Sequence, residues 1–173
     1  EAPCLGYSFQ SDQPVTALIK DRIPATLSIA AGASVLWLLI GLSSGFVSAI
    51  RRGTFVDKLS QGMALGAASL QIYFVGLVLQ FIFVNKLQWL PTPGYNSPFK
   101  YPLDWVKGMI LPWMTLAFLL SAMYSRLTRS GMIEVMSEDY IRTARAKGLP
   151  ERTVIMRHAF RNTLIPLTTL IVV

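Results

Sequence analysis

Ionisable residues are scarce in this 173-residue chain and are missing altogether from three long stretches. Only 14% of the residues are Asp, Glu, Lys or Arg, against 53% hydrophobic residues, whereas a soluble domain is usually about one-quarter charged. The stretches 25–50, 59–84 and 109–125 contain no Asp, Glu, Lys, Arg or His. A helix needs about 20 mostly apolar residues to cross a bilayer. The pattern therefore argues against a soluble protein and predicts three transmembrane helices.

Residue types suited to chemistry are also rare. The chain has one cysteine, Cys4, and one histidine, His158, so it holds neither the cysteine pair of a disulfide nor a His/Cys metal set. It contains neither HExxH nor the phosphate-binding sequence GxxxxGK[ST]. We expect an unpaired thiol at Cys4 and a packing or capping role for His158. The sequence thus predicts a protein that is not an enzyme, with no catalytic, metal-binding or cofactor-binding residue.

The three apolar stretches also lack an ionisable pair. Proton- and ion-coupled transporters commonly carry such groups within the membrane. If this protein moves a solute, we expect the energy to come from another subunit.

Basic residues are distributed unevenly along the chain. Of 16 Lys and Arg residues, 11 lie in segments 51–58 and 126–161, and five lie elsewhere. The positive-inside rule places the richer side in the cytoplasm. The N-terminus is then external, as is the loop at 85–105, which is rich in proline and aromatic residues.

These observations predict an all-α, polytopic membrane protein in two parts. Residues 1–24 form an external segment, with a short helix at 13–22 lying along the membrane surface. Residues 25–173 form the transmembrane domain, with helices at about 25–50, 59–84 and 106–130 and the start of a fourth at about 162–173. Ten apolar residues are too few to cross a bilayer, so we expect further transmembrane sequence after this segment.

Small and polar residues mark surfaces that helices use to pack. Two GxxxG motifs, at 41–45 and 62–66, allow close helix contacts. Polar side chains inside the apolar stretches avoid lipid and face either another helix or a watery path. Both roles, structural hydrogen bonding and a translocation path, remain open for Gln71, Tyr73, Gln80, Ser121 and Tyr124.

A charged segment at 137–161 follows the third apolar stretch. Ser137 suits a helix N-cap, Gly148 suits the residue after a helix end, and Pro150 suits the first turn of a second helix. We therefore expect a short helix, a sharp turn and a second helix that enters the membrane. On a helical wheel one face holds Tyr140, Ile141, Ala144 and Gly148, and the opposite face holds Glu138, Arg142 and Arg145.

So short a helix is marginal alone in water and needs a partner surface. An anionic lipid surface, nucleic acid and a cytosolic protein are all conceivable partners. The hinged, mixed-charge design favours the protein and disfavours nucleic acid.

The same segment resembles the cytoplasmic "EAA" loop of ATP-binding-cassette importer permeases, in particular the dipeptide/oligopeptide/nickel branch. The resemblance rests on EDYIRTARAKG (138–148), RHAFRN (157–162) and IP (165–166), and it extends to LGYSF (5–9), RIPATL (22–27) and RRGTFVDK (51–58). Arg142 and Thr143 depart from the general EAAxxxG pattern, whereas Ala144 and Gly148 match it. The general I-x-LP ending falls at His158, Phe160 and Arg161 and is not kept. These departures are usual in the peptide branch.

The resemblance implies a permease of about six helices in a bacterial or archaeal cell membrane, of which this chain shows three and the start of a fourth. It implies a second, related permease subunit, two ATPase subunits that bind ATP and Mg, an external solute-binding protein and the surrounding lipid bilayer. Peptides are the expected cargo, with nickel, glutathione or oligosaccharide as alternatives. A self-contained channel and a membrane scaffold are the rival functions.

In this reading the helix at 137–148 couples the permease to the ATPase. Tyr140, Ile141 and Ala144 would lie in a groove of the ATPase, while Arg142 and Arg145 would meet acidic groups on its rim. The hinge is expected at Gly148 and Pro150. The expected coupling residues are Glu138, Asp139, Tyr140, Ile141, Arg142, Thr143, Ala144, Arg145, Lys147 and Gly148.

Overall fold

The computed structural model describes residues 6–8, 13–96, 98 and 100–172. The expectations for 1–5, 9–12 and Val173, Cys4 included, lie outside the described residues. Within the described part the chain is helical, and its only β contact is an isolated bridge between Tyr7 and Pro14. The elements are α1 (Val15–Ile50), α2 (Phe55–Ser69), α3 (Ile72–Gln80), the π-helix η1 (Phe81–Lys86), α4 (Pro102–Ser137), α5 (Asp139–Ala146), α6 (Glu151–Thr153), the π-helix η2 (Val154–Phe160) and α7 (Arg161–Val172).

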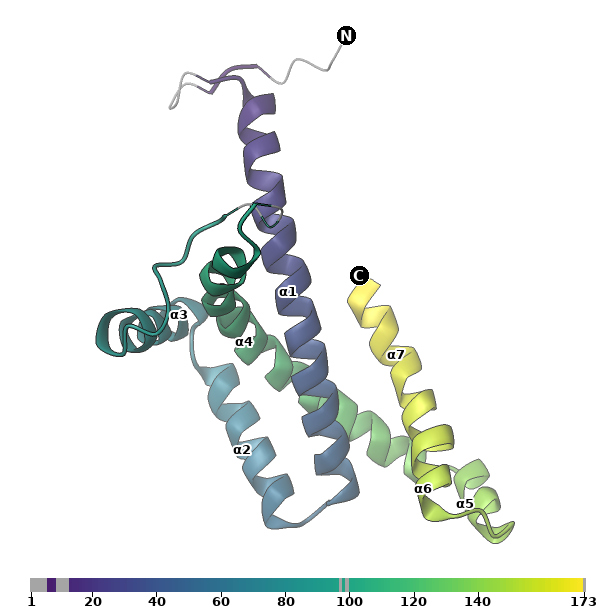
Figure 1. The fold of residues 1–173 in the computed structure, drawn as a ribbon. Helices are drawn as coiled ribbons and strands as arrows, with labels where there is room; N and C mark the ends of the chain where they lie inside the picture. The colour runs from purple at the N-terminus through teal and green to yellow at the C-terminus, as the bar shows by residue number, and fades with distance from the viewer. Residues whose placement is uncertain (1–5, 9–12, 97, 99, 173) are drawn as a thin grey trace.

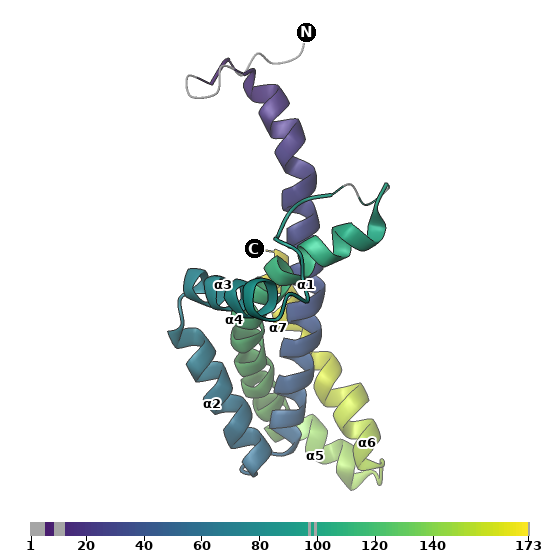
Figure 2. The same ribbon diagram turned by 60° about the vertical axis from the view of Figure 1, so that its left-hand side comes forward.

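The long helices α1 and α4 form the framework of the molecule. Both are long and apolar enough to cross a membrane, and α2 with α3 would form a third, broken span. α2 lies on one side of α1 and α7 on the other, with α4 crossing α1 (Figure 1). The α1–α2 turn and α5 lie toward the same end of the molecule, away from the N-terminus, in both views (Figures 1 and 2). We call this end, which carries Arg51, Arg52, Arg126 and Arg129, the basic end.

Glycine lets α1 and α4 approach closely. A Cβ added at Gly45 would lie 2.5 Å from the carbonyl oxygen of Ser125 and 2.7 Å from Cβ of Thr128. A Cβ added at Gly41 would lie 2.8 Å from Cβ of Tyr124. The first GxxxG motif therefore packs against α4 of the same chain, as close backbone contacts between membrane helices require.

The predicted single helix at 59–84 is wrong, because the chain breaks between α2 and α3. The two helices meet at a bend of 99°, and Leu70 and Gln71 have extended backbones with ψ near 136°. The residues before the break, Gly66–Ser69, are small, and a Cβ added at Gly66 would meet no atom of the described chain within 4 Å. Of these four residues only Ala67 is buried, where it packs with Ala64 and Ala122. Few side chains therefore hold the chain in a helix beyond this turn.

Two further boundaries differ from the expected ones. Residues 15–22 are not a separate surface helix but the first turns of α1, which continues through Pro24. The third helix is longer than 106–130 at both ends and runs from Pro102 to Ser137. Pro102 occupies the first turn, where its missing N–H costs nothing. At the other end, Met132 is fully buried against neighbouring helices, which extends the helix.

Candidate functional site

The α5 helix is attached to the basic end of the molecule by two short connections. Only Glu138, which has an extended backbone (ψ 149°), separates α5 from α4. On the other side, residues 147–150 lead to α6. Ser137 is the last residue of α4, and its hydroxyl donates to the carbonyl of Glu134. The expected N-cap at Ser137 is therefore wrong by one residue, and Glu138 occupies that position without a side-chain capping bond.

The apolar face of α5 is buried within its own chain. Ile141 is 0% exposed and Ala144 is 8% exposed. They join a core cluster whose other buried members come from α1, α4 and η2: Ala49, Met132, Val154 and Ala159. The expectation that Ile141 and Ala144 lie in a groove of a partner is therefore wrong, because Ile141 has no free surface and Ala144 has almost none. The helical wheel identified the apolar face of α5 correctly, but that face packs against the chain's own helices.

The outward face of α5 is polar. Asp139, Arg142 and Thr143 are exposed, and an Arg142 N–H donates to Asp139 at 3.3 Å in an exposed pair. Tyr140, 42% exposed, lies at the edge of this face and accepts a hydrogen bond of 2.9 Å from the Asn162 side chain at the start of α7. The accessible surface of α5 thus offers charges and hydroxyls rather than apolar anchors.

The turn after α5 has the conformation that its glycine predicts. Gly148 has φ +75°, a left-handed conformation that side chains rarely adopt. Its N–H donates to the carbonyl of Arg145. Pro150 immediately precedes α6 as its N-cap, rather than lying in its first turn. The predicted turn at 148–150 is confirmed, with the second helix starting one residue later than expected.

An ion pair braces this turn. The guanidinium of Arg145 donates to both carboxylate oxygens of Glu151 at 3.0 and 2.7 Å. The hydrogen bond from Arg145 lowers the pKa of Glu151 and raises the pKa of Arg145. Both side chains are about half exposed, so the pair contributes little to stability. Arg145 is therefore already engaged within the chain, whereas Arg142 faces outward.

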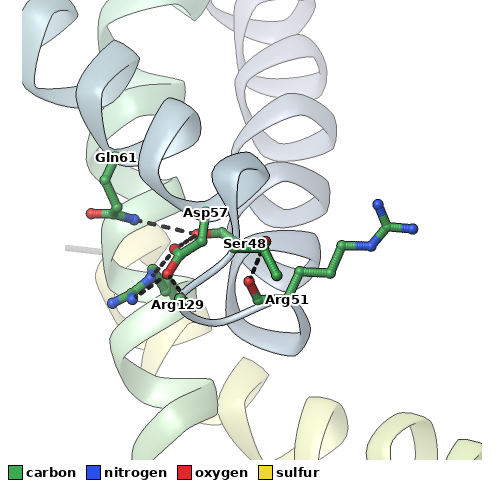
Figure 3. A network of polar contacts seen from close by, with 7 residues as sticks. Ser48, Arg51, Asp57, Gln61 and Arg129 are labelled. Atoms are coloured by element: carbon green, nitrogen blue, oxygen red, sulfur yellow. Dashed lines mark hydrogen bonds and ion pairs between the residues drawn. The ribbon is translucent and has the colours of Figure 1, made fainter.

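A buried ion pair lies at the basic end, where α1, α2 and α4 meet (Figure 3). Arg129 of α4 donates to both oxygens of Asp57 in α2, at 2.7 and 2.9 Å. The Asp57 carboxylate also accepts from Ser48 Oγ of α1 at 2.5 Å and from the Gly53 N–H at 2.9 Å. The side chain of Asp57 is 6% exposed and that of Arg129 is 24% exposed. We call these four residues the Asp57 clamp.

Sequence reasoning missed the Asp57 clamp because its partners are 72 residues apart. A signal was nevertheless present. Asp57 is the only acid in the basic segment 51–58, and Arg129 follows the third apolar stretch by about one turn. A charge placed next to a membrane helix usually finds a partner.

The candidate path residues fall into two groups. Tyr73 and Gln80 line an open cleft between α3 and α4, and Gln71 lies at the break before α3. Ser121 and Tyr124 are instead buried in α4, and Tyr124 packs on Trp37 of α1 with ring centroids 6.2 Å apart. The structure therefore does not bring the five residues together. Of the two roles that the sequence left open for Ser121 and Tyr124, their burial favours packing between helices.

The described residues contain no group of three His, Cys, Asp or Glu side chains that could hold a metal ion. Asp57 accepts bonds from its own chain through both oxygens, and Glu151 is paired with Arg145.

The helical architecture, with two long apolar helices and a third, broken span, is that of a multi-pass membrane protein. Residues 37–173 match the sequence family described as binding-protein-dependent transport system inner membrane component, and residues 1–30 match the N-terminal family of the same membrane component. The chain belongs to this family, and the predicted multi-pass membrane component of a binding-protein-dependent transport system is confirmed.

Several curated relatives align with nearly all of the chain. It is 38% identical over 165 residues to a Brucella abortus protein named as a peptide transport system permease. The aligned region covers 95% of this chain and 52% of that relative. It is 36% identical to the glutathione transport system permease protein GsiC of Escherichia coli, with 96% of this chain and 52% of that relative aligned. It is 33% identical to the dipeptide transport system permease protein DppB of Alkalihalophilus pseudofirmus, with 96% of this chain and 56% of that relative aligned. The chain thus spans about half the length of the curated relatives it matches.

Proposed function

We propose that this chain belongs to the permease subunit of an ATP-driven importer and receives mechanical work through α5. The proposal rests on the contrast between the two faces of α5. Its inner face is packed into a core shared by α1, α4 and η2, while its outer face is polar and accessible. A force applied to the outer face would move the helices behind it, because a close-packed core transmits displacement rather than absorbing it.

The remaining subunits follow from this role. Two ATPase subunits bind ATP and Mg and engage α5 of this permease and of a second, related permease. An external solute-binding protein delivers the cargo. Peptides are the proposed cargo, supported by relatives whose names refer to peptide and dipeptide transport. Glutathione, which is itself a short peptide, remains an alternative cargo because one relative is named for its transport.

Docking on the ATPase is assigned to the outer face of α5: Asp139, Tyr140, Arg142, Thr143 and Lys147. Arg142 is the main candidate, because its only described partner is the exposed Asp139 at 3.3 Å. Arg145 has a secondary role, since Glu151 already occupies its guanidinium. Gly148 and Pro150 shape the turn that connects α5 to α6 and the helices beyond.

The path through the membrane is proposed to run along the cleft between α3 and α4. Tyr73 and Gln80 line this cleft, and the broken helix before it supports the proposal. Interrupted helices in transporters commonly lie beside substrate sites, because irregular backbone at membrane depth is tolerated only next to protein or water.

A charge reversal on the outer face of α5 tests the docking proposal. Arg142→Glu in the full-length permease should abolish copurification of the ATPase subunit and ATP-driven peptide uptake into proteoliposomes, while thermal stability of the permease stays unchanged. Arg152→Glu, an exposed residue of α6, is the matched control and should retain both. Undiminished copurification and uptake for Arg142→Glu would contradict the proposal, as would an equal loss in the control.

A further inference from the structure

A cleft with a cationic mouth lies between α2 and α4 at the basic end. Its polar lining gathers at one end and consists of Gln61, Arg126, Arg129 and Ser130. Toward the other end its walls are apolar and include Ala68 from α2 and Leu119 and Met123 from α4. From Ser130 to Leu119 along α4 is about 16 Å at 1.5 Å per residue. The cleft therefore changes from polar to apolar along its length.

The mouth of the cleft lies where the hydrocarbon core of a bilayer would end. Arg126 is the first charged residue after the apolar stretch 109–125, and Lys58 is the last charged residue before the stretch 59–84. Both stretches belong to the helices that form the two walls. The polar end of the cleft is thus at the level of lipid headgroups, and the apolar end is at the level of acyl chains.

The charges at the mouth of the cleft favour binding of a single, singly charged anion. Arg129 is neutralised by Asp57 through its Nε and Nη2 atoms, which leaves the Nη1 donors unused by that pair. Arg126 is exposed and takes no part in the ion pairs formed among the described residues. Figure 3 shows Arg129 and Gln61 on the same side of the network, with Arg51 pointing the opposite way. The cleft mouth therefore carries a net charge of about +1 with additional hydrogen-bond donors, which matches a singly charged phosphodiester.

From this juxtaposition we propose that the α2–α4 cleft is a binding site for an anionic phospholipid. The phosphate contacts Arg126, the Nη1 donors of Arg129 and the Gln61 amide hydrogen that is not directed to Ser48. The Ser130 hydroxyl donates to the carbonyl of Leu127 and only lines the mouth. One acyl chain follows Met123, Leu119 and Ala68. Basic pockets between transmembrane helices are known to hold such headgroups. A peptide passing through the membrane would need polar partners along the whole cleft, and here they gather at one end.

Lipid retention by the complete transporter tests this site. The transporter with its full-length permease is reconstituted in vesicles of phosphatidylcholine with about one-third phosphatidylglycerol, extracted in mild detergent, and analysed by native mass spectrometry for bound lipid. Arg126→Gln should reduce phosphatidylglycerol retention about fivefold, the ratio that corresponds to about 1 kcal/mol for one arginine near an anionic surface. Arg126→Lys should keep most of the retention.

Two controls separate the site from general surface charge. Arg52→Gln removes an exposed arginine of the same basic end that does not line the cleft, and it should leave retention unchanged. Ala68→Phe fills the cleft without changing charge and should lower retention as Arg126→Gln does. Equal retention in wild type and Arg126→Gln, or equal losses for Arg126→Gln and Arg52→Gln, would overturn the proposal.

Two further measurements distinguish other occupants. Phosphatidylcholine held as tightly as phosphatidylglycerol, or displacement of the lipid by millimolar inorganic phosphate, would show that the site does not select an anionic lipid. A disulfide cross-link between Ala68→Cys and a cysteine on the second permease, made in a Cys4→Ser background, would place a protein helix in the cleft. Each of these outcomes rejects the lipid site and leaves the proposed docking role of α5 untouched, because that role depends on a different surface.

Discussion

The Asp57 clamp offers the sharpest test of how the basic end is held together, because its two charges are buried to different degrees. Asp57 is 6% exposed and Arg129 is 24% exposed. A buried pair is worth little relative to an apolar pair, but removal of one partner leaves an uncompensated charge at a cost of about 3–5 kcal/mol. The cost should follow the burial of the charge that remains.

The two single substitutions are therefore expected to be unequal. Arg129→Gln leaves the nearly buried carboxylate with its bonds from Ser48 and Gly53 alone, and we expect a loss of about 4 kcal/mol in the free energy of unfolding. Asp57→Asn leaves a guanidinium that can reach water, and we expect about 2.5 kcal/mol. The double variant leaves no unpaired charge, so it should lose about 3.5 kcal/mol, which is less than Arg129→Gln alone and about 3 kcal/mol less than the sum of the single losses.

The assay is reversible unfolding of the full-length permease in mixed micelles, repeated for the two single variants and the double variant. Arg52→Gln, an exposed arginine in the α1–α2 turn, is the control and should stay within about 0.5 kcal/mol of the wild type. Additive losses in the double variant, or a larger loss for Asp57→Asn than for Arg129→Gln, would refute the reasoning from burial.

Two other predictions follow from local geometry. Gly45→Ala should destabilise the permease by about 1–3 kcal/mol, because the new Cβ would lie 2.5 Å from the Ser125 carbonyl oxygen. Gly66→Ala is the control and should not destabilise the isolated permease, because its Cβ would meet no atom of the described chain within 4 Å. An equal loss at both sites in thermal unfolding would contradict this. Glu151→Gln should weaken protection of the Gly148 amide in hydrogen exchange at pH 7 by about 0.5 kcal/mol. Because Arg145 lowers the pKa of Glu151 below its ordinary 4.5, this difference should persist above pH 4.5 and vanish as the pH falls through the lowered pKa; a difference that grows on acidification would contradict the pair.

The main helices could be predicted from the sequence because membrane insertion acts on long stretches of the chain. A charge-free run of about 20 residues leaves few alternatives to a spanning helix, and this identified α1 and α4. The turn after α5 was equally accessible, since Gly148 supplies the positive φ that the helix end requires. In both cases the decisive physics lies within a few neighbouring residues or within the composition of one segment.

The break between α2 and α3 could not be predicted in the same way. Neither proline nor a charge marks Leu70 and Gln71, and the break depends on tertiary packing, in which only Ala67 of the small residues before it is buried. The Asp57 clamp depends likewise on which helices become neighbours. Both features are tertiary, so the chain's local pattern carries only weak signals of them.

The orientation of α5 shows most clearly where a helical wheel stops being informative. The wheel separates an apolar face from a charged one, but it cannot say whether the apolar face meets a partner or the same chain. Here Ile141 and Ala144 meet Met132 and Val154, so any partner of α5 must bind through Tyr140, Arg142 and their polar neighbours. A contact of this kind depends on charge and is screened by salt. Binding of a partner to α5 should therefore weaken as ionic strength rises, whereas the apolar packing of α5 on the permease core should not. This difference suits an element that stays attached to its own chain and binds its partner reversibly.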